Sequence, residues 1–338
     1  MKMKYIKKNY YKIITFIILI SFLYIFEIYL FSKTKNFEYL KKKFIDKNLI
    51  SHNFIKDFIK KDQIHLTTFQ DTSIKVYCDK NKTLSTNFDK FGFLNENDNW
   101  KKLNENLILK TYSEINCNDF NLSNSKKFLL KSKNNLDIGS ISSGPIHQYA
   151  LLNEYFDNIN AKKALWLHFE GSDLSDLNNL KNEKLNNYFQ NNSYSKNLSK
   201  FSSNKKNLEV KKHLKKFDYS ILKKELRNII FLYQTRNLIK IKNKNYTNSN
   251  IIKKFNYNEI DELAEILNKT NTMLKRNNVE FIFFFMPREG ELDNVGKNEE
   301  IKNFLFKKLD KNNIKYFDLT DEIYTKSDNE IYLDNLIF

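Results

Sequence analysis

The chain has 338 residues, 41% of them hydrophobic and 15% aromatic, which is enough for a packed core in one large domain or two modest ones. The formal net charge of +17 comes almost wholly from Lys, and Asn, Ile, Phe and Tyr are also abundant, which is typical of A/T-rich codon usage. Proteins that read nucleic acids favour the bidentate fork of Arg, and only four Arg occur here, so we expect no nucleic-acid partner.

A nineteen-residue apolar segment at 13–31 predicts a membrane-spanning helix. Only Thr15, Ser21 and Glu27 interrupt it, and its length is close to the roughly 20 residues that cross the hydrocarbon core. Lysines crowd residues 1–12 and no small-residue cleavage site follows the segment, which indicates an uncleaved signal anchor with a cytoplasmic tail at 1–12. We therefore expect a single-pass protein of the inner membrane whose larger part lies outside the cytoplasm, in the periplasm.

The remainder of the chain divides into a polar stretch and an α/β domain. Residues 32–87 are mixed in character and are expected to be a linker that leads to the edge of the domain. From 88 to 338, short apolar runs alternate with helical spacing, which predicts a mostly parallel sheet with right-handed crossovers. The expected strands lie at 106–110, 136–138, 164–170, 279–286 and 314–319.

The expected helices lie at 119–131, 146–156, 217–241 and 257–276. An Asn-, Ser- and Lys-rich stretch at 178–215 shows no period, and we expect it to be a mobile polar insertion in the domain.

Glycine and proline are scarce, with six and two residues respectively, so their positions are informative. Four of the glycines and one proline fall in three patches, which read FGFLNENDNW at 91–100, GSISSGP at 139–145 and EGSDL at 170–174. The last two patches follow expected strands, and parallel α/β sheets place their ligand chemistry in such loops.

Together these patches resemble a bacterial branch of the SGNH/GDSL hydrolase superfamily. In that branch a GFRN…W segment precedes a GDSF nucleophile loop, then a GnGP turn with a following EY pair, and a strand that ends in EGND. The matching residues here include Gly144-Pro145, Glu154-Tyr155 and the segment 164–177, and the likeness is close over 88–180. It implies a flavodoxin-like three-layer sandwich and an ancestral esterase or acyltransferase that acts on extracytoplasmic acyl groups, including those of carbohydrates.

Enzymes of this superfamily attack an ester with a Ser that a His–Asp pair activates, and backbone and Asn donors stabilise the oxyanion. The resemblance puts Thr111 at the nucleophile position, directly after Lys110. It puts Gly139 and Ser142 in the oxyanion loop, with Ser142 in place of the Gly whose N–H usually points at the oxyanion, and Ser172 at the Asn position.

Glu170 and Asp173 complete the candidate catalytic set, with helix capping or loop hydrogen bonding as the alternative for both. The two cysteines lack metal-ligand spacing, so we expect no metal and no cofactor. A disulfide between Cys78 and Cys117 is one option for a chain outside the cytoplasm.

The His that the family carries after its last strand has no counterpart, because the last His of this sequence is His213. We expect His168 to be a packed strand residue and His147 to lie on a helix surface. Since loss of triad members leaves only residual catalysis, the altered positions predict an impaired hydrolase, a pseudoenzyme. Two alternatives remain: a reading frame that continues beyond Phe338 and restores the His, and a non-enzymatic module that binds a carbohydrate, acyl ester or protein partner through the same residues.

Overall fold

The computed structural model of the protein describes residues 2–61, 66, 67, 69–78, 83–110, 127–129, 134–139, 144–170, 173, 177, 183–191, 193–241, 257–287, 295–324 and 330–332. The strands are β1 (Leu49–Ser51), β2 (Thr72–Tyr77), β3 (Thr83–Phe88), β4 (Asn104–Lys110), β5 (Lys127–Leu129), β6 (Asn135–Asp137), β7 (Ala161–Phe169), β8 (Glu280–Met286), β9 (Lys315–Asp318) and β10 (Glu330–Tyr332).

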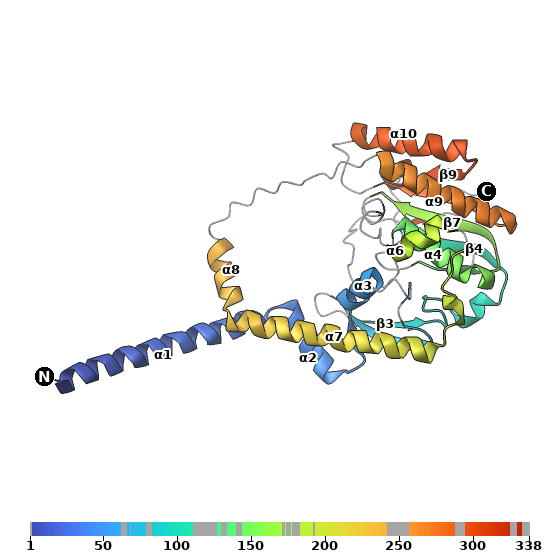
Figure 1. The fold of residues 1–338 in the computed structure, drawn as a ribbon. Helices are drawn as coiled ribbons and strands as arrows, with labels where there is room; N and C mark the ends of the chain where they lie inside the picture. The colour runs from blue at the N-terminus through green and yellow to red at the C-terminus, as the bar shows by residue number, and fades with distance from the viewer. Residues whose placement is uncertain are drawn as a thin grey trace.

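The helices are α1 (Lys2–Ser32), α2 (Lys35–Ile45), α3 (His52–Lys61), α4 (Pro145–Tyr155), α6 (Glu183–Gln190), α7 (Ser203–Ile230), α8 (Tyr233–Ile241), α9 (Tyr257–Arg276), α10 (Val295–Lys311) and α11 (Thr320–Tyr324). Short 3₁₀ turns are η1 (Asn97–Trp100), η2 (Phe156–Asn158) and η3 (Leu198–Lys200). Figure 1 shows an α/β body from which α1 projects.

The body is built on a five-stranded parallel sheet in the order β6-β4-β7-β8-β9. In chain order these strands read 2-1-3-4-5, which is the order of flavodoxin-like doubly wound sheets. All five predicted strands are present, with bounds within three residues of those expected. The prediction of a mixed α/β fold with a parallel sheet is therefore confirmed.

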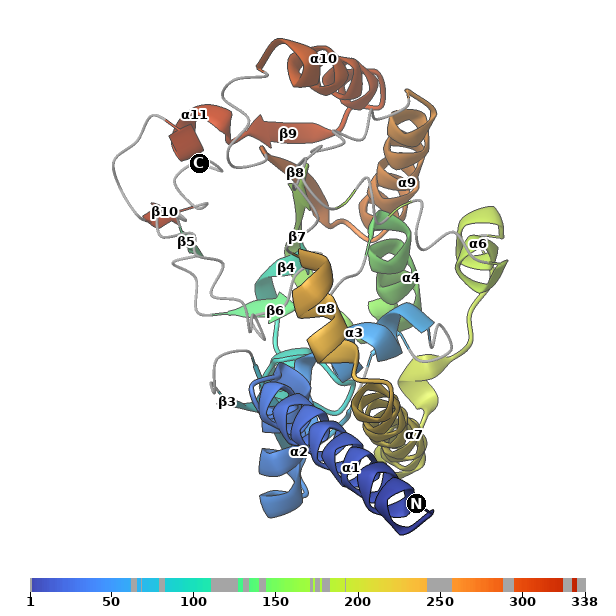
Figure 2. The same cartoon turned by 90° about the vertical axis from the view of Figure 1, so that its left-hand side faces the viewer.

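The helices α4, α9 and α10 cover one face of this sheet, and α11 lies against the other (Figure 2). Along β7 and β8 the side chains alternate between the two faces of the sheet. Trp166 and Phe283 belong to the main core under α4, α9 and α10, and Leu165 and Phe284 belong to a smaller core on the opposite face. Burial on both faces explains why β8 is a continuous apolar run. The chain moves in one direction across the sheet from β6 to β9, so right-handed crossovers put these three helices on one side.

The region between the apolar helix and the body contains more structure than a linker. Residues 32–87 include α2, α3 and a second sheet, in which β1 pairs parallel with β2 and β2 pairs antiparallel with β3. Phe54 and Phe58 of α3, four residues apart on one helix face, pack with Val76 of β2 and with Val210 of α7. This small core depends on a helix that lies more than a hundred residues further along the chain, which the local sequence of 32–87 does not reveal.

The stretch at 178–215 also differs from the prediction of a mobile insertion, because it includes α6, η3 and the first part of α7. Leu185 and Tyr188 of α6 are fully buried in the main core. The helix expected at 217–241 begins earlier, at Ser203, and a turn at 231–232 divides it into α7 and α8. Within the helix expected at 119–131, residues 127–129 instead form β5, which pairs with β10, and the other residues of that range lie outside the described part.

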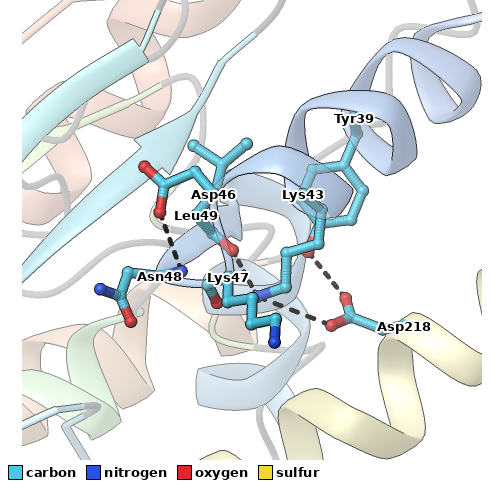
Figure 3. A network of polar contacts seen from close by, with 7 residues as sticks. All are labelled: Tyr39, Lys43, Asp46, Lys47, Asn48, Leu49 and Asp218. Atoms are coloured by element: carbon cyan, nitrogen blue, oxygen red, sulfur yellow. Dashed lines mark hydrogen bonds and ion pairs between the residues drawn. The ribbon is translucent and has the colours of Figure 1, made fainter.

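A polar network ties α2 to α7 (Figure 3). Tyr39 donates to Asp218 over 2.7 Å, and Lys43 Nζ lies 3.8 Å from the same carboxylate while it donates to the backbone oxygen of Leu49 over 2.6 Å. Burial raises the pKa of Tyr39 and of Asp218 and lowers the pKa of Lys43. The network therefore fixes the first helix after the apolar segment onto α7.

One helix of the described residues is long and apolar enough to cross a membrane, the segment Tyr10–Ser32 of α1, with a mean hydropathy of 2.4. Almost all of this segment is exposed, unlike the core helix of a soluble protein. Its one acidic residue, Glu27, is fully buried and accepts hydrogen bonds from the backbone N–H groups of Gln234 and Thr235 over 2.7 and 2.8 Å. Glu27 thus caps the first turn of α8, where helix N–H groups lack partners within the helix.

Candidate functional site

The candidate residues lie at the carboxyl edge of three adjacent strands. Lys110 ends β4, Asp137 ends β6 and Phe169 ends β7, and β4 lies between the other two strands. The direction of winding reverses between β4 and β7, and such a switch point is where open α/β sheets bind ligands. Thr111 directly follows Lys110, but Thr111, Ser142 and Ser172 lie outside the described residues. The fold therefore brings to one edge the three strand ends that precede them in the sequence.

Gly139 and Lys110 both interact with Asp137 at this edge. The Gly139 N–H donates to Asp137 Oδ1 over 2.7 Å, and the Lys110 ammonium forms an ion pair with Asp137 Oδ2. A side chain at Gly139 would clash with Lys110, since a Cβ atom there would lie 2.5 Å from Lys110 Cγ. The scarcity of glycine correctly marked a close approach at this position. At Gly139, one of the candidate oxyanion positions, the N–H is engaged by a carboxylate.

A buried carboxylate, Asp89, organises the patch at 91–100. Its Oδ1 accepts from the backbone N–H groups of Phe91, Gly92 and Phe93 over 2.8–3.0 Å. Its Oδ2 accepts from Trp100 Nε1 over 2.7 Å and from the Asn95 amide over 3.1 Å. Burial raises the pKa of Asp89, while these donors act in the opposite direction.

Gly92 allows the tight turn around this carboxylate. Its φ is +92°, and an added Cβ would lie 2.7 Å from Phe69 O. Asp89 precedes the patch as one acidic residue among 40, so the sequence alone gave no reason to single it out.

Asn95 connects this loop to the candidate edge. Its side-chain amide donates to the backbone oxygen of Asp137 over 2.8 Å and accepts from the Asp137 N–H over 2.9 Å. The same amide donates to Asp89, so one chain of contacts runs from Trp100 through Asp89 and Asn95 to the end of β6. Asn95 and Asp89 are positioning residues that the sequence analysis did not identify.

The Glu-Tyr pair of α4 has a packing role. Glu154 accepts from Tyr188 Oη over 2.5 Å and from the backbone N–H groups of Lys196 and Leu198, which fastens the loop after α6. Tyr155 packs against the rings of Phe91, Phe93 and Trp100, with centroids 5.2–6.2 Å apart. Two of the motifs that carry the family resemblance are thus in direct contact.

Asp173 points into the protein. Its carboxylate is fully buried, accepts from the Phe169 N–H over 2.8 Å and lies 3.1 Å from His168 Nδ1, outside hydrogen-bond geometry. The His168 ring is fully buried and stacks on Phe283 at 5.5 Å, which confirms it as a packed strand residue. The hydrogen bond that Asp173 accepts from the Phe169 N–H is the loop hydrogen bonding that was the alternative to a catalytic role. Glu170 is 7% exposed, and its N–H donates to Met286 O, which prolongs the pairing of β7 with β8.

His147 does not lie on a helix surface, and that expectation is wrong. Its ring is fully buried, and Nε2 donates to Leu66 O over 2.9 Å. Burial lowers its pKa to about 4. Nearly every residue of α4 is buried because the helix is enclosed by the sheet, α6 and α9, so the polar residues in its sequence do not mark an exposed face.

Cys78 is disulfide-bonded, and the one other cysteine of the sequence, Cys117, lies outside the described residues. Within the described ranges, no group of three or more His, Cys, Asp and Glu side chains is arranged to hold a metal ion. No protein-family model, no curated protein and no solved structure matches the chain.

Proposed function

We propose that this chain is a membrane-anchored protein with an SGNH-like domain that binds a carbohydrate or acyl ester ligand outside the cytoplasm without hydrolysing it. The three glycine-bearing patches and the 2-1-3-4-5 strand order support the family assignment. The exposed apolar surface of α1 supports the anchor. Superfamily membership does not fix chemistry, so the residues at the carboxyl edge of the sheet decide between binding and hydrolysis.

One observation carries the proposal: Asp137 engages both Gly139 and Lys110 at the switch point. An oxyanion hole needs N–H groups aimed at the developing negative charge, whereas the Asp137 carboxylate, bound to the N–H of one candidate oxyanion position, repels such a charge. The two His nearest to this edge in sequence, His147 and His168, are fully buried and engaged in packing. A site with these properties favours ligand binding over general-base chemistry.

The hydrolysis test uses the full chain in detergent micelles with p-nitrophenyl acetate. The wild-type protein and Thr111→Ala are expected to give equal rates, both close to the buffer background. A wild-type rate tenfold or more above that of Thr111→Ala would instead establish an esterase that uses Thr111, and the binding-only function would be abandoned.

The binding test uses a glycan array with the same full-length protein. Glu170→Ala and Ser172→Ala are expected to weaken the signal, because both residues closely follow β7 in the sequence and belong to the candidate site. The matched control is Glu105→Ala, since Glu105 is exposed at the opposite end of β4. If both edge variants bind as strongly as this control, the ligand site lies elsewhere. Extraction of membranes at alkaline pH tests the anchor separately, with the protein expected to stay in the pellet.

A further inference from the structure

A basic hollow of about 390 Å³ lies where α7 meets α8. Its walls include four cationic side chains and two aromatic ones: Lys223, Lys224, Arg227, Arg236, Phe231 and Tyr233. Two of the four Arg of the whole sequence meet here, in a chain whose positive charge comes almost wholly from Lys. Arg presents a planar fork of donors that matches phosphate oxygens, so the composition of the hollow suits a phosphate group.

The positive charge of the hollow is not paired with acidic side chains among the described residues. Within the part of the chain that the structure describes, the side chains of these four cations form no ion pair. The nearest acidic residue along α7, Glu225, is 4% exposed and is engaged by the side-chain amides of Asn36 and Asn228 over 2.7 and 3.2 Å. Four cations that form no ion pair with a described residue repel one another, and a bound anion would relieve that repulsion.

The hollow lies beside the end of the apolar helix. Tyr24 of α1 donates to the backbone oxygen of Ile230, and Glu27 caps α8, so the α7–α8 turn is level with residues 24–27. These residues come five to eight positions before Ser32, which at 1.5 Å per residue is roughly 8–12 Å below the end of the apolar segment. This is close to the depth at which amphipathic helices enter the boundary between headgroups and acyl chains, about 5–10 Å.

The side chains around the hollow also suit the boundary between lipid headgroups and acyl chains. Leu222, Leu226 and Ile230 form an exposed stripe at four-residue spacing, with exposed fractions of 45%, 52% and 59%. Phe231 beside them is 58% exposed. In Figure 1 α8 rises at a steep angle to α1, which is the direction expected of an interfacial helix beside a helix that crosses the membrane. Exposed apolar side chains next to a cluster of cations are what an interfacial helix presents to anionic lipid.

We propose that this hollow binds the phosphate of an anionic phospholipid headgroup, with the acyl chains lying along the exposed stripe of α7. The inference rests on the proposed membrane anchor and is independent of any chemistry at the carboxyl edge of the sheet. The lipid holds α7 and α8 at the membrane surface and, through the network of α2 with α7, sets the orientation of the α/β body above it.

The experiment titrates the full chain in a non-ionic detergent with dioleoyl phosphatidylglycerol and, separately, with dioleoyl phosphatidylcholine, and counts bound lipid by native mass spectrometry. Phosphatidylglycerol is expected to bind roughly tenfold more tightly, since each Lys or Arg near a lipid surface contributes measurably to anionic selectivity. The double variant R227Q/R236Q is expected to reduce this preference to about twofold or less, and R227K/R236K to restore part of it.

The matched control K211Q/K212Q removes the same charge from exposed positions of α7 outside the hollow, and should keep the preference. Equal binding of the two lipids by the wild-type chain, an unchanged preference in R227Q/R236Q, or an equal loss in the control would each overturn the proposal. Full displacement of the lipid by 10 mM inorganic phosphate would overturn it in favour of a site for free phosphate. Circular dichroism checks that the variants keep the helix content of the wild type, and alkaline extraction reports separately on the anchor.

Discussion

The five-stranded sheet and the helical unit of α1, α7 and α8 use similar apolar residues in opposite ways. Trp166 and Phe283 of the sheet are fully buried, whereas Leu226 and Ile230 of α7 are more than half exposed. A sheet covered on both faces gains its stability by excluding water. A long exposed apolar stripe has no such gain in water, and this contrast is what we expect if the helical unit contacts a lipid bilayer as proposed.

Asp89→Asn tests the polar support of the sheet region and carries the largest expected effect. The carboxylate has five donors, and an amide at this position would direct its own N–H groups toward some of them. Breaking such a buried charged network costs about 3–5 kcal/mol in the free energy of unfolding. Thermal unfolding followed by circular dichroism should show a drop in Tm of about 10 °C, judged from about 2–4 °C per kcal/mol for a domain of this size.

The control for that prediction is Asp157→Asn, at an exposed position of η2. Its Tm should change little, because surface substitutions usually stay within about 0.5 kcal/mol. If Asp89→Asn lowers the stability no more than Asp157→Asn does, the carboxylate does not organise the loop.

His147 makes the sheet region sensitive to acid. Its pKa is about 4 in the folded protein and near 6.5 in the unfolded chain, so between these values the unfolded state binds more protons. The free energy of unfolding therefore falls as the pH drops from about 6.5 to 4, by about 3 kcal/mol if the whole pKa difference is realised. His147→Gln should remove this part of the pH dependence, measured by thermal unfolding at pH 4, 5, 6 and 7.

His213→Gln is the matched variant, because His213 is exposed on α7. It should keep the wild-type pH dependence. An acid sensitivity that is the same with and without the His147 ring would show that other groups cause it.

The sequence predicted the sheet better than its surroundings for a physical reason. Strand β8 and helix α9 carry their patterns locally, as a continuous apolar run and a helical period, and their predicted bounds match closely. By contrast, α6 is held by Tyr188 and Glu154, and α3 by contacts with Val210, all between residues far apart in sequence. From composition alone we predicted that these segments were a linker and an insertion, because their own residues do not reveal the distant residues that they pack against.

The residues of the candidate site also differ in how well the sequence alone could identify them. Gly139 was identified from the scarcity of glycine, and its close contact with Lys110 explains why no side chain fits there. Asp89 and Asn95 were missed, because their role appears only when residues 91–100 fold around one carboxylate. Predictions for Thr111, Ser142 and Ser172 stay predictions. His147 was misplaced because a helix that is buried almost all round has no polar face by which to judge it.

Glu27→Ala tests the helical side of the comparison and has the smallest expected effect. The carboxylate caps α8 through two backbone N–H groups and the Thr235 hydroxyl, and loss of a helix cap costs about 0.5–2 kcal/mol. A loss of 1–2 kcal/mol raises the population of opened α8 by about 5–30-fold. Trypsin cleavage after Arg236 should accelerate by a similar factor when opening is fast relative to cleavage, while Glu105→Ala, far from α8, should leave the rate unchanged. An unaltered cleavage rate in Glu27→Ala would mean that α8 is held by its apolar contacts alone. A lower Tm of the whole protein in this variant would mean that α8 stabilises the α/β body as well as the anchor.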